Sequence, residues 1–196
     1  SATINVVSTG SAGVADNVLA LTVADNQLVN LTGSQNTTLT VTNAPSTTGV
    51  SIDASTFTGN ATITGSNDAD IIKGGSGVDV INGGDGADLL SGNGGGDTFG
   101  IAITSAGVTG TQFLAAADTV TDFVTKSDKL EFGAAAGSST NYAEAAAAVA
   151  DFDAALAAAD TALNGTVLYS GRQVGSDVYV FFDTDGTLDS TGTEVV

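Results

Sequence analysis

The sequence predicts a mainly β protein built as a parallel β-solenoid, with a C-terminal cap that contains one Ala-rich helix and a β-hairpin. Three observations lead to this prediction. Short stretches of alternating apolar residues recur about every ten residues through positions 1–64. A nine-residue motif then repeats four times without gaps over residues 65–100. An alanine-rich stretch and two strand-like segments follow within residues 101–196.

Residues 1–64 are rich in Thr, Ser and Asn and contain five strand-like stretches, Leu19–Val23, Leu28–Leu31, Leu39–Val41, Val50–Ile52 and Ala61–Thr64. Such a rhythm suits a β-solenoid or a β-sandwich, because both are built from short strands with one buried face. The stretches lead into the nonapeptides without a linker, which favours the solenoid. Pro45, the only proline, is expected in a loop between two strands.

The four nonapeptides are GSNDADIIK, GGSGVDVIN, GGDGADLLS and GNGGGDTFG. An aspartate recurs every nine residues, at Asp70, Asp79, Asp88 and Asp97, and a large apolar residue stands two positions after each, at Ile72, Ile81, Leu90 and Phe99. The glycines favour tight turns, and the apolar residue is expected to point inward from a very short strand. Two nonapeptides complete one coil, so stacking of coils at ~4.8 Å should place Asp70 near Asp88 and Asp79 near Asp97.

Stacked carboxylates and turn carbonyls supply the hard oxygen ligands that calcium prefers. Without a cation, four like charges at this spacing would repel one another, which disfavours the alternative of an acidic turn repeat without metal. The candidate calcium ligands are Asp70, Gly74, Gly75, Gly77, Asp79, Gly83, Gly84, Gly86, Asp88, Gly92, Gly94 and Asp97. A second acidic loop, 183–189, departs from EF-hand spacing and is better explained by an Asp-Gly turn.

The C-terminal region is predicted to begin with a strand-like pair, Ile101–Ile103 and Thr119–Phe123, followed by Lys129–Phe132. A helix is predicted from Ala143 to Leu163, with a capping box at Asn141 and Glu144 and a stop at Asn164–Gly165. Its bulky residues Val149, Phe152, Leu156 and Leu163 form one stripe that should cover a sheet, although a partner-binding helix is the alternative. The closing hairpin is predicted to pair Thr166–Ser170 with Asp177–Phe182 across 171–176.

Composition excludes several classes of function. The chain has 22 acidic and 4 basic residues, a net charge of −18, which argues against nucleic acid and anionic membranes as partners. It has no Cys and no His, which excludes disulfides, zinc fingers, thiol nucleophiles and Ser-His-Asp triads within these residues. We therefore expect a protein that is not an enzyme. Because residue 1 is Ser and Met is absent, we also expect a processed product or part of a longer protein.

Residues 65–100 resemble the RTX calcium-binding β-roll of proteins exported by bacterial type I secretion systems. Asp118–Phe132 resembles the segment that caps such rolls in secreted proteases and surface-layer proteins, and 179–186 resembles the hairpin before an uncleaved secretion signal. The resemblance implies bound Ca²⁺, a roll at 65–100 and a capping and secretion-signal-like region at 101–196. The departures Ser66, Asp68 and Asn93 predict weaker outer sites.

Two functions remain open. One is a structural fragment of a surface-layer (S-layer) protein that folds with calcium and self-assembles into a lattice on the bacterial cell surface after type I secretion. The other is the C-terminal, calcium-folded export module of a secreted RTX protease or adhesin. The solenoid-like residues 1–64 favour the first. Its expected partners are the type I secretion machinery and further copies of the chain. Contact with cell-surface polysaccharide through upstream regions is a further possibility. A third reading takes Thr38, Thr40 and Thr42 as part of an ice- or carbohydrate-facing array, but an ordinary solvated sheet face explains them better.

Overall fold

The computed structural model describes residues 2–10, 16–43, 48–101, 117–124, 127–131, 142–144, 150, 152–162, 169–174, 177–183 and 193–195. The chain divides into two compact units. The first comprises Ser1–Ala102 and Asp118–Gly133, and the second comprises Ile103–Ala117 and Ala134–Val196. Part of the region expected to cap the roll therefore belongs to the same unit as the nonapeptides.

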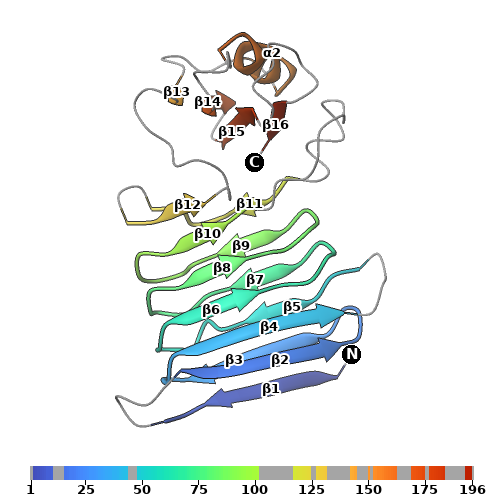
Figure 1. Ribbon diagram of the computed structural model, residues 1–196, viewed down its shortest axis with the longest axis vertical. Coiled ribbons are helices and arrows are strands. Elements are labelled where there is room, and N and C mark those ends of the chain that lie inside the picture. Colours follow the sequence, from blue (N-terminus) through green and yellow to red (C-terminus); the bar gives the residue numbers. More distant parts are fainter. Residues whose placement is uncertain are drawn as a thin grey trace. The chain divides into compact units, whose positions relative to one another are not determined.

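The first unit is a parallel β-solenoid, as the sequence predicts (Figure 1). Its odd-numbered strands form one six-stranded sheet and its even-numbered strands form another, and every neighbouring pair is parallel. The strands are β1 (Thr3–Ser8), β2 (Asn17–Val23), β3 (Leu28–Gly33), β4 (Thr37–Asn43), β5 (Ser51–Asp53), β6 (Ala61–Thr64), β7 (Ile71–Lys73), β8 (Val80–Asn82), β9 (Leu89–Ser91), β10 (Thr98–Gly100), β11 (Thr119–Val120) and β12 (Lys129–Glu131).

The core of the solenoid consists of two columns of apolar side chains, one on each sheet. Parallel register aligns one residue of each coil with the next, so that the apolar residues stack on their counterparts. The first column is Ile4, Val29, Ile52, Ile72, Leu90 and Val120, and the second is Leu19, Leu39, Ile63, Ile81, Phe99 and Leu130. Every member except the first and last of each column is at most 1% exposed. The predicted inward direction of the apolar residue in each nonapeptide is confirmed.

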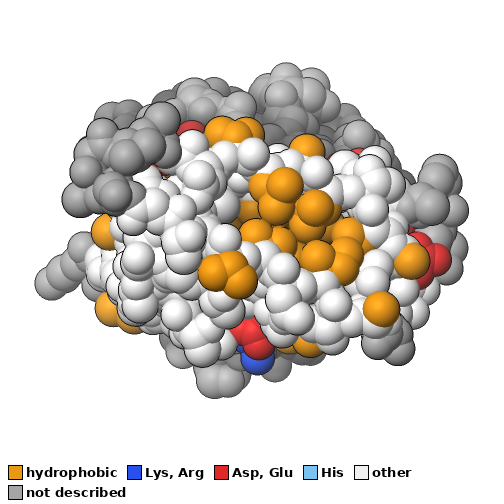
Figure 2. Space-filling model, turned by 90° about the horizontal axis from the view of Figure 1, so that it is seen from below, with side chains coloured by type: hydrophobic (Ala, Val, Ile, Leu, Met, Phe, Trp, Pro, Cys, Tyr) orange, Lys and Arg blue, Asp and Glu red, His pale blue; other side chains and the backbone are white. Residues whose placement is uncertain are grey.

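The N-terminal end of the solenoid leaves part of this core open. β1 and β2 are the terminal strands of their sheets, and no other coil among the described residues covers their apolar side chains on that side. Ile4, Val6, Leu19 and Leu21 are accordingly only half-buried. Figure 2, which views the molecule from below, shows apolar side chains gathered at the centre of this end.

The five strand-like stretches predicted in residues 1–64 are all found as strands, and β1 adds one that was not predicted. Pro45 lies outside the described residues. Of the two strand-like segments predicted at Ile101–Ile103 and Thr119–Phe123, the second contains β11, which pairs with β9. Ile101 follows the end of β10, and residues 102 and 103 lie outside the described part of the chain. Stacking β11 on the existing sheet satisfies the backbone groups of β9, which a separate pair of strands would leave open.

The second unit contains a four-stranded sheet in the order β13-β14-β15-β16 and the helix α2 (Phe152–Ala162), which contacts β14 and β15. The strands are β13 (Tyr142–Glu144), β14 (Tyr169–Val174), β15 (Asp177–Asp183) and β16 (Thr193–Val195). The predicted hairpin is confirmed, because β14 and β15 pair in antiparallel fashion. Its turn is shorter than predicted, because 171–174 are part of β14. Residues 166–168 lie outside the described residues.

The predicted start of the helix is wrong. Residues 142–144, assigned to the helix and its capping box, form β13 and pair in parallel with β14. Here the hydrogen bonds of sheet pairing outweigh the helix propensity of alanine. The helix does cover a sheet, but the residues seen to be buried on it are Ala155 and Ala159, one turn apart. Asn141, Val149 and Leu163, and the side chains of Phe152 and Leu156, lie outside what the structure describes.

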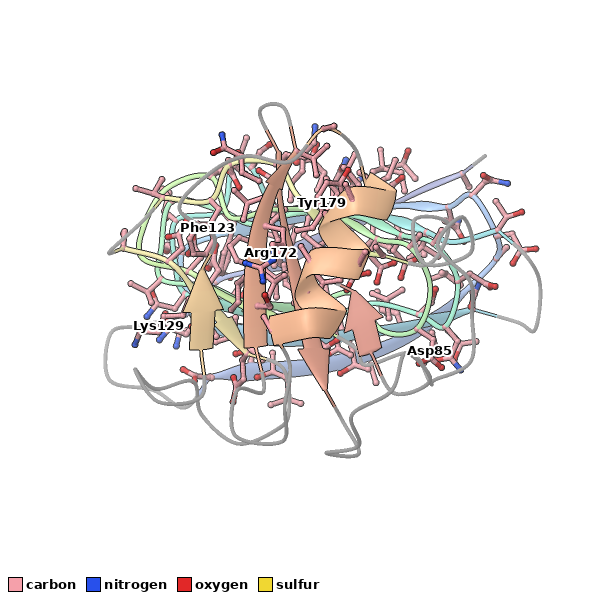
Figure 3. All side chains as sticks on the ribbon, turned by 90° about the horizontal axis from the view of Figure 1, so that it is seen from above. Asp85, Phe123, Lys129, Arg172 and Tyr179 are labelled. Atoms are coloured by element: carbon pink, nitrogen blue, oxygen red, sulfur yellow. The ribbon has the colours of Figure 1, made fainter. Side chains whose placement is uncertain are left out.

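Arg172 connects β14 to the helix. Its side chain is buried, and Nη2 donates a 2.9 Å hydrogen bond to the carbonyl oxygen of Ala158. Figure 3 labels Arg172. None of the helices in the described ranges has the length and apolar character needed to cross a membrane.

Candidate calcium-binding site

All twelve candidate ligands lie in the loops of the solenoid or at the ends of those loops. Each of the four aspartates immediately precedes a strand, β7, β8, β9 or β10, and each is at most 2% exposed. Gly84 and Gly86 have φ values of 110° and 120°, which glycine adopts at little energetic penalty. Asn93, at a position where the repeat expects glycine, also takes a left-handed conformation, with φ of 63°. Asn93 thus shares a positive φ with Gly84, the residue at the same position of the third repeat.

One edge of the solenoid carries a ladder of aspartates. Oδ1 of Asp70 accepts a 2.7 Å hydrogen bond from the amide of Val50, one coil earlier. Oδ1 of Asp88 in turn accepts a 2.8 Å hydrogen bond from the amide of Asp70. Oδ1 of Asp118 accepts a 3.0 Å hydrogen bond from the amide of Asp88. The predicted neighbours Asp70 and Asp88 are thus joined directly, and the ladder continues beyond the nonapeptides.

A second ladder runs along the other edge. Oδ1 of Asp79 accepts a 2.7 Å hydrogen bond from the amide of Ala61. Oδ1 of Asp97 accepts a 2.8 Å hydrogen bond from the amide of Asp79. The next rung is Asp128, whose Oδ1 accepts a 3.0 Å hydrogen bond from the amide of Asp97. Each carboxylate therefore fixes the backbone of the preceding coil. This structural role was not predicted from the sequence.

Asp118 and Asp128 were not predicted as members of the ladders. The signal was present, because Asp118 and Asp128 each stand two positions before an apolar residue of the core columns, Val120 and Leu130. This is the spacing found in every nonapeptide. The glycine-rich half of the motif is missing before both aspartates, and the spacing from the preceding rung is 30 or 31 residues instead of 18.

The second carboxylate oxygen distinguishes the repeats. Oδ2 of Asp70 accepts from the amide of Ser66, and Oδ2 of Asp79 accepts from the amide of Gly75. In the third repeat the corresponding amide, that of Gly84, donates to Oδ1 of Asn82 instead, at 3.1 Å. Oδ2 of Asp88 is buried and has no hydrogen-bond partner. A buried oxygen of this kind carries a large desolvation penalty unless a cation or a proton compensates it.

The glycine loops stack with backbone against backbone. A side chain at Gly65 would collide with the carbonyl oxygen of Gly83, and a side chain at Gly77 would collide with that of Gly59. A side chain at Gly83 would collide with Oδ2 of Asp88. Glycine is therefore required at Gly65 and Gly77 for the close approach of successive loops, and at Gly83 for the approach of the Asp88 carboxylate within its own loop.

Burial raises the pKa of all four aspartates. The pKa of Asp88 rises to about 7, because burial and the nearby Asp118 and Asp70 carboxylates outweigh the hydrogen bond from the Asp70 amide. The pKa of Asp97 rises to about 6, mainly through burial, with repulsion from Asp79, Asp128 and Asp122. These carboxylates are thus energetically unfavourable as anions in the absence of a cation.

Asp122 differs from the ladder aspartates. It accepts hydrogen bonds from Ser91 Oγ at 2.7 Å and from the amides of Gly92 and Asn93 at 3.0 and 2.8 Å. Burial alone would raise the pKa of its carboxyl group, but these bonds hold the pKa below the ordinary value. Asp122 therefore closes a loop and has no need of a cation.

In the described part of the chain, no three acidic side chains converge as they would in a metal site built from carboxylates alone. A cation in these loops would therefore need backbone carbonyl oxygens as well. Calcium accepts such mixed oxygen ligands in flexible geometry, whereas magnesium demands a near-ideal octahedron. The buried Oδ2 of Asp88 and the close-packed glycine loops fit calcium.

Comparison with known proteins agrees with this chemistry. Residues 57–99 match the family model of the RTX calcium-binding nonapeptide repeat, in four copies. The chain contains an RTX β-roll. The match begins at Phe57, in the coil before the first predicted nonapeptide. RTX repeats bind calcium ions, so residues 57–99 carry repeats of a calcium-binding family. The searches of curated proteins and of solved structures returned no match.

Proposed function

We propose that this chain is a structural part of a bacterial surface-layer protein that leaves the cell by type I secretion, folds with calcium outside it, and self-assembles. The observation that carries the proposal is the pair of buried aspartate ladders that run through the RTX roll into the following coil. RTX repeat proteins are typically secreted and extracellular, which agrees with this location.

Calcium would act as a folding switch. The candidate ligands are the four nonapeptide aspartates and the loop carbonyl groups. The raised pKa values show that burial of these carboxylates opposes folding near neutral pH. An ion that binds only the folded chain supplies the missing stability, about 2.7 kcal/mol per site at a 100-fold excess over its dissociation constant. Extracellular calcium modules work at affinities of ~10⁻⁴–10⁻³ M, so the chain would stay loosely folded before export.

Self-association is supported by the distribution of charge and apolar surface. Residues 1–52 contain two acidic residues and no basic residue, although the chain carries −18 in total. The N-terminal end of the solenoid, with half-buried Ile4, Val6, Leu19 and Leu21, is therefore a surface that another copy can approach with little repulsion. Elsewhere, calcium at contacts between copies would offset the negative charge.

The sheet faces offer a second kind of repeating surface. On the outer face of β2, β4 and β6, threonines align in register, with Thr38 opposite Thr62 and Thr40 opposite Thr64. Thr22 and Thr42 share a 3.2 Å hydrogen bond between their hydroxyl groups. Such regular, uncharged faces would suit lateral packing in a lattice. We propose a structural, non-catalytic role, since the sequence lacks both His and Cys.

The alternative, an export module of a secreted RTX protease or adhesin, is favoured by one observation. The second unit is a separate compact body whose hairpin, β14 and β15, resembles the one that precedes a secretion signal. The module would then bring the roll and hairpin to an unrelated functional domain.

Electron microscopy of the full-length parent protein, with and without millimolar calcium, tests the proposal. Ordered sheets that form only with calcium are the expected result. A parent that stays monomeric in calcium and cleaves a substrate would overturn the surface-layer role and support the export module. Circular dichroism in EGTA and in calcium tests the folding switch separately, and identical spectra would overturn it.

A further inference from the structure

Asparagines take the place of aspartates on one edge of the N-terminal coils. Asn36 and Asn60 immediately precede β4 and β6, as Asp79 and Asp97 immediately precede β8 and β10. Oδ1 of Asn36 accepts a 2.9 Å hydrogen bond from the amide of Asn60. Oδ1 of Asn60 accepts a 3.0 Å hydrogen bond from the amide of Val78. These two side chains therefore connect successive coils without a charge.

The direction of the connecting hydrogen bonds changes at the coil that contains β6. The asparagines accept from the amide of the following coil. Asp79 instead accepts from the amide of Ala61, in the preceding coil. The neighbouring residues Asn60 and Ala61 are thus joined to the neighbouring residues Val78 and Asp79 by two bonds of opposite direction. This coil is the boundary between neutral rungs and carboxylate rungs.

The other edge changes at the same place along the solenoid. The ladder there begins at Asp70, which accepts from the amide of Val50, immediately before β5. In the described part of residues 1–64, the buried polar side chains are those of Ser8 and Thr37, and both are neutral. Oγ of Ser8 donates a 2.9 Å hydrogen bond to the carbonyl oxygen of Gln35. These buried hydroxyl groups need no cation to compensate a charge.

The N-terminal coils also have longer strands and a larger apolar core. β3 and β4 have six and seven residues, whereas β7, β8, β9 and β10 have three each. Each of these three-residue strands buries one apolar side chain. β3 and β4 together bury four, all 0% exposed, namely Val29, Leu31, Leu39 and Val41. Apolar burial therefore favours folding of the N-terminal coils, and no buried carboxylate in their described residues opposes it.

We propose that the coils from β1 to β6 fold without calcium, and that β5 and β6 are the template on which the roll assembles when calcium binds. Each coil of a solenoid contacts only its neighbours, so one part can be ordered while the next is not. The inference rests on the proposed calcium switch and confines that switch to the coils after β6. The competing model is a single cooperative unit, in which calcium is needed to order every coil.

Hydrogen–deuterium exchange of the full chain, measured by mass spectrometry in EGTA and in millimolar calcium, tests the boundary. In EGTA, peptides from residues 28–43 should exchange at least about tenfold more slowly than peptides from residues 71–91. In calcium, both groups should be protected. Fast exchange of both groups in EGTA would overturn the inference and leave the proposed calcium switch intact. Protection of both groups in EGTA would instead overturn the proposed switch.

A matched pair of variants assigns the protection to the rungs. Asn36→Ala removes the acceptor for the amide of Asn60 and should speed exchange of residues 28–43 in EGTA severalfold. Asp97→Ala removes the acceptor for the amide of Asp79 and should leave that exchange unchanged. Equal acceleration in both variants would overturn the inference, because the N-terminal coils would then depend on the roll. The comparison in the unaltered protein applies even if neither variant folds.

Discussion

The amide of Asp79 donates a 2.8 Å hydrogen bond to Oδ1 of Asp97, the aspartate at the same place in the next coil. Through this contact a candidate metal ligand also holds two coils in register. Folding of the backbone and organisation of the calcium site are therefore coupled at the same carboxylate. Removal of such a residue should affect both, and the following predictions separate the two effects.

Asp79→Ala should weaken calcium binding at least tenfold, about 1.4 kcal/mol per site. The substitution removes two acceptors, for the amides of Ala61 and Gly75, together with a candidate ligand. Asp85→Ala is the matched control, because Asp85 is exposed in the next loop and carries the same charge. Calorimetric titration measures both, and equal losses would show that total charge and not the site geometry governs binding.

Leu39→Ala should lower the free energy of unfolding of the calcium-bound protein by about 2–5 kcal/mol, because it leaves a cavity in a fully buried column. Leu19→Ala, one coil earlier in the same column, should have a clearly smaller effect, since Leu19 is only half-buried at the open end. Denaturant unfolding in saturating calcium measures the difference. Similar losses for both variants would mean that the N-terminal end is covered in solution.

Gly84→Ala should destabilise the roll by about 1–3 kcal/mol. Gly84 has φ of 110°, and an added Cβ would collide with the carbonyl oxygen of Ser66. Gly94→Ala is the control, because a Cβ there would meet its nearest neighbour, the Cα atom of Ser76, at 3.7 Å. Thermal unfolding in calcium should separate the two variants, and a Gly84 variant as stable as the Gly94 variant would contradict the described loop.

The pH dependence of stability should reverse with calcium. Burial raises the pKa of Asp88 to about 7 and that of Asp97 to about 6, from an ordinary value of 3.8. At a pH between 3.8 and these raised pKa values, the folded chain binds more protons than the unfolded chain. Stability in EGTA should therefore fall as the pH rises from 5 to 8. In calcium, stability should instead rise with pH over this range, because protons compete with the ion for the carboxylates. Tm measured across this range in both conditions checks the prediction, and a Tm in EGTA that rises with pH would contradict it.

Much of the roll could be predicted from residue spacing alone. The recurrence of Asp70, Asp79, Asp88 and Asp97, each two positions before an apolar residue, determines a coil of two nonapeptides, an inward apolar column and two acidic edges. These features depend on local turns and on the two-residue period of strands, both of which are encoded within each repeat. The choice of calcium follows from the chemistry of carboxylates and carbonyls and is supported by the family match.

Long-range pairing decided the remainder. Whether residues 142–144 extend a helix or form β13 depends on the neighbouring strand β14, about 27 residues away in sequence, and alanine propensity carries no information about that partner. Likewise, Asp118 and Asp128 follow intervals of 30 and 31 residues from the preceding rungs, so no fixed repeat relates them to the roll. The sequence by itself determined the coil, its acidic edges and their preference for calcium, because these arise within nine residues. Only the tertiary structure decided where the ladders end and which buried oxygen lacks a partner, because hydrogen bonds between distant segments settle both.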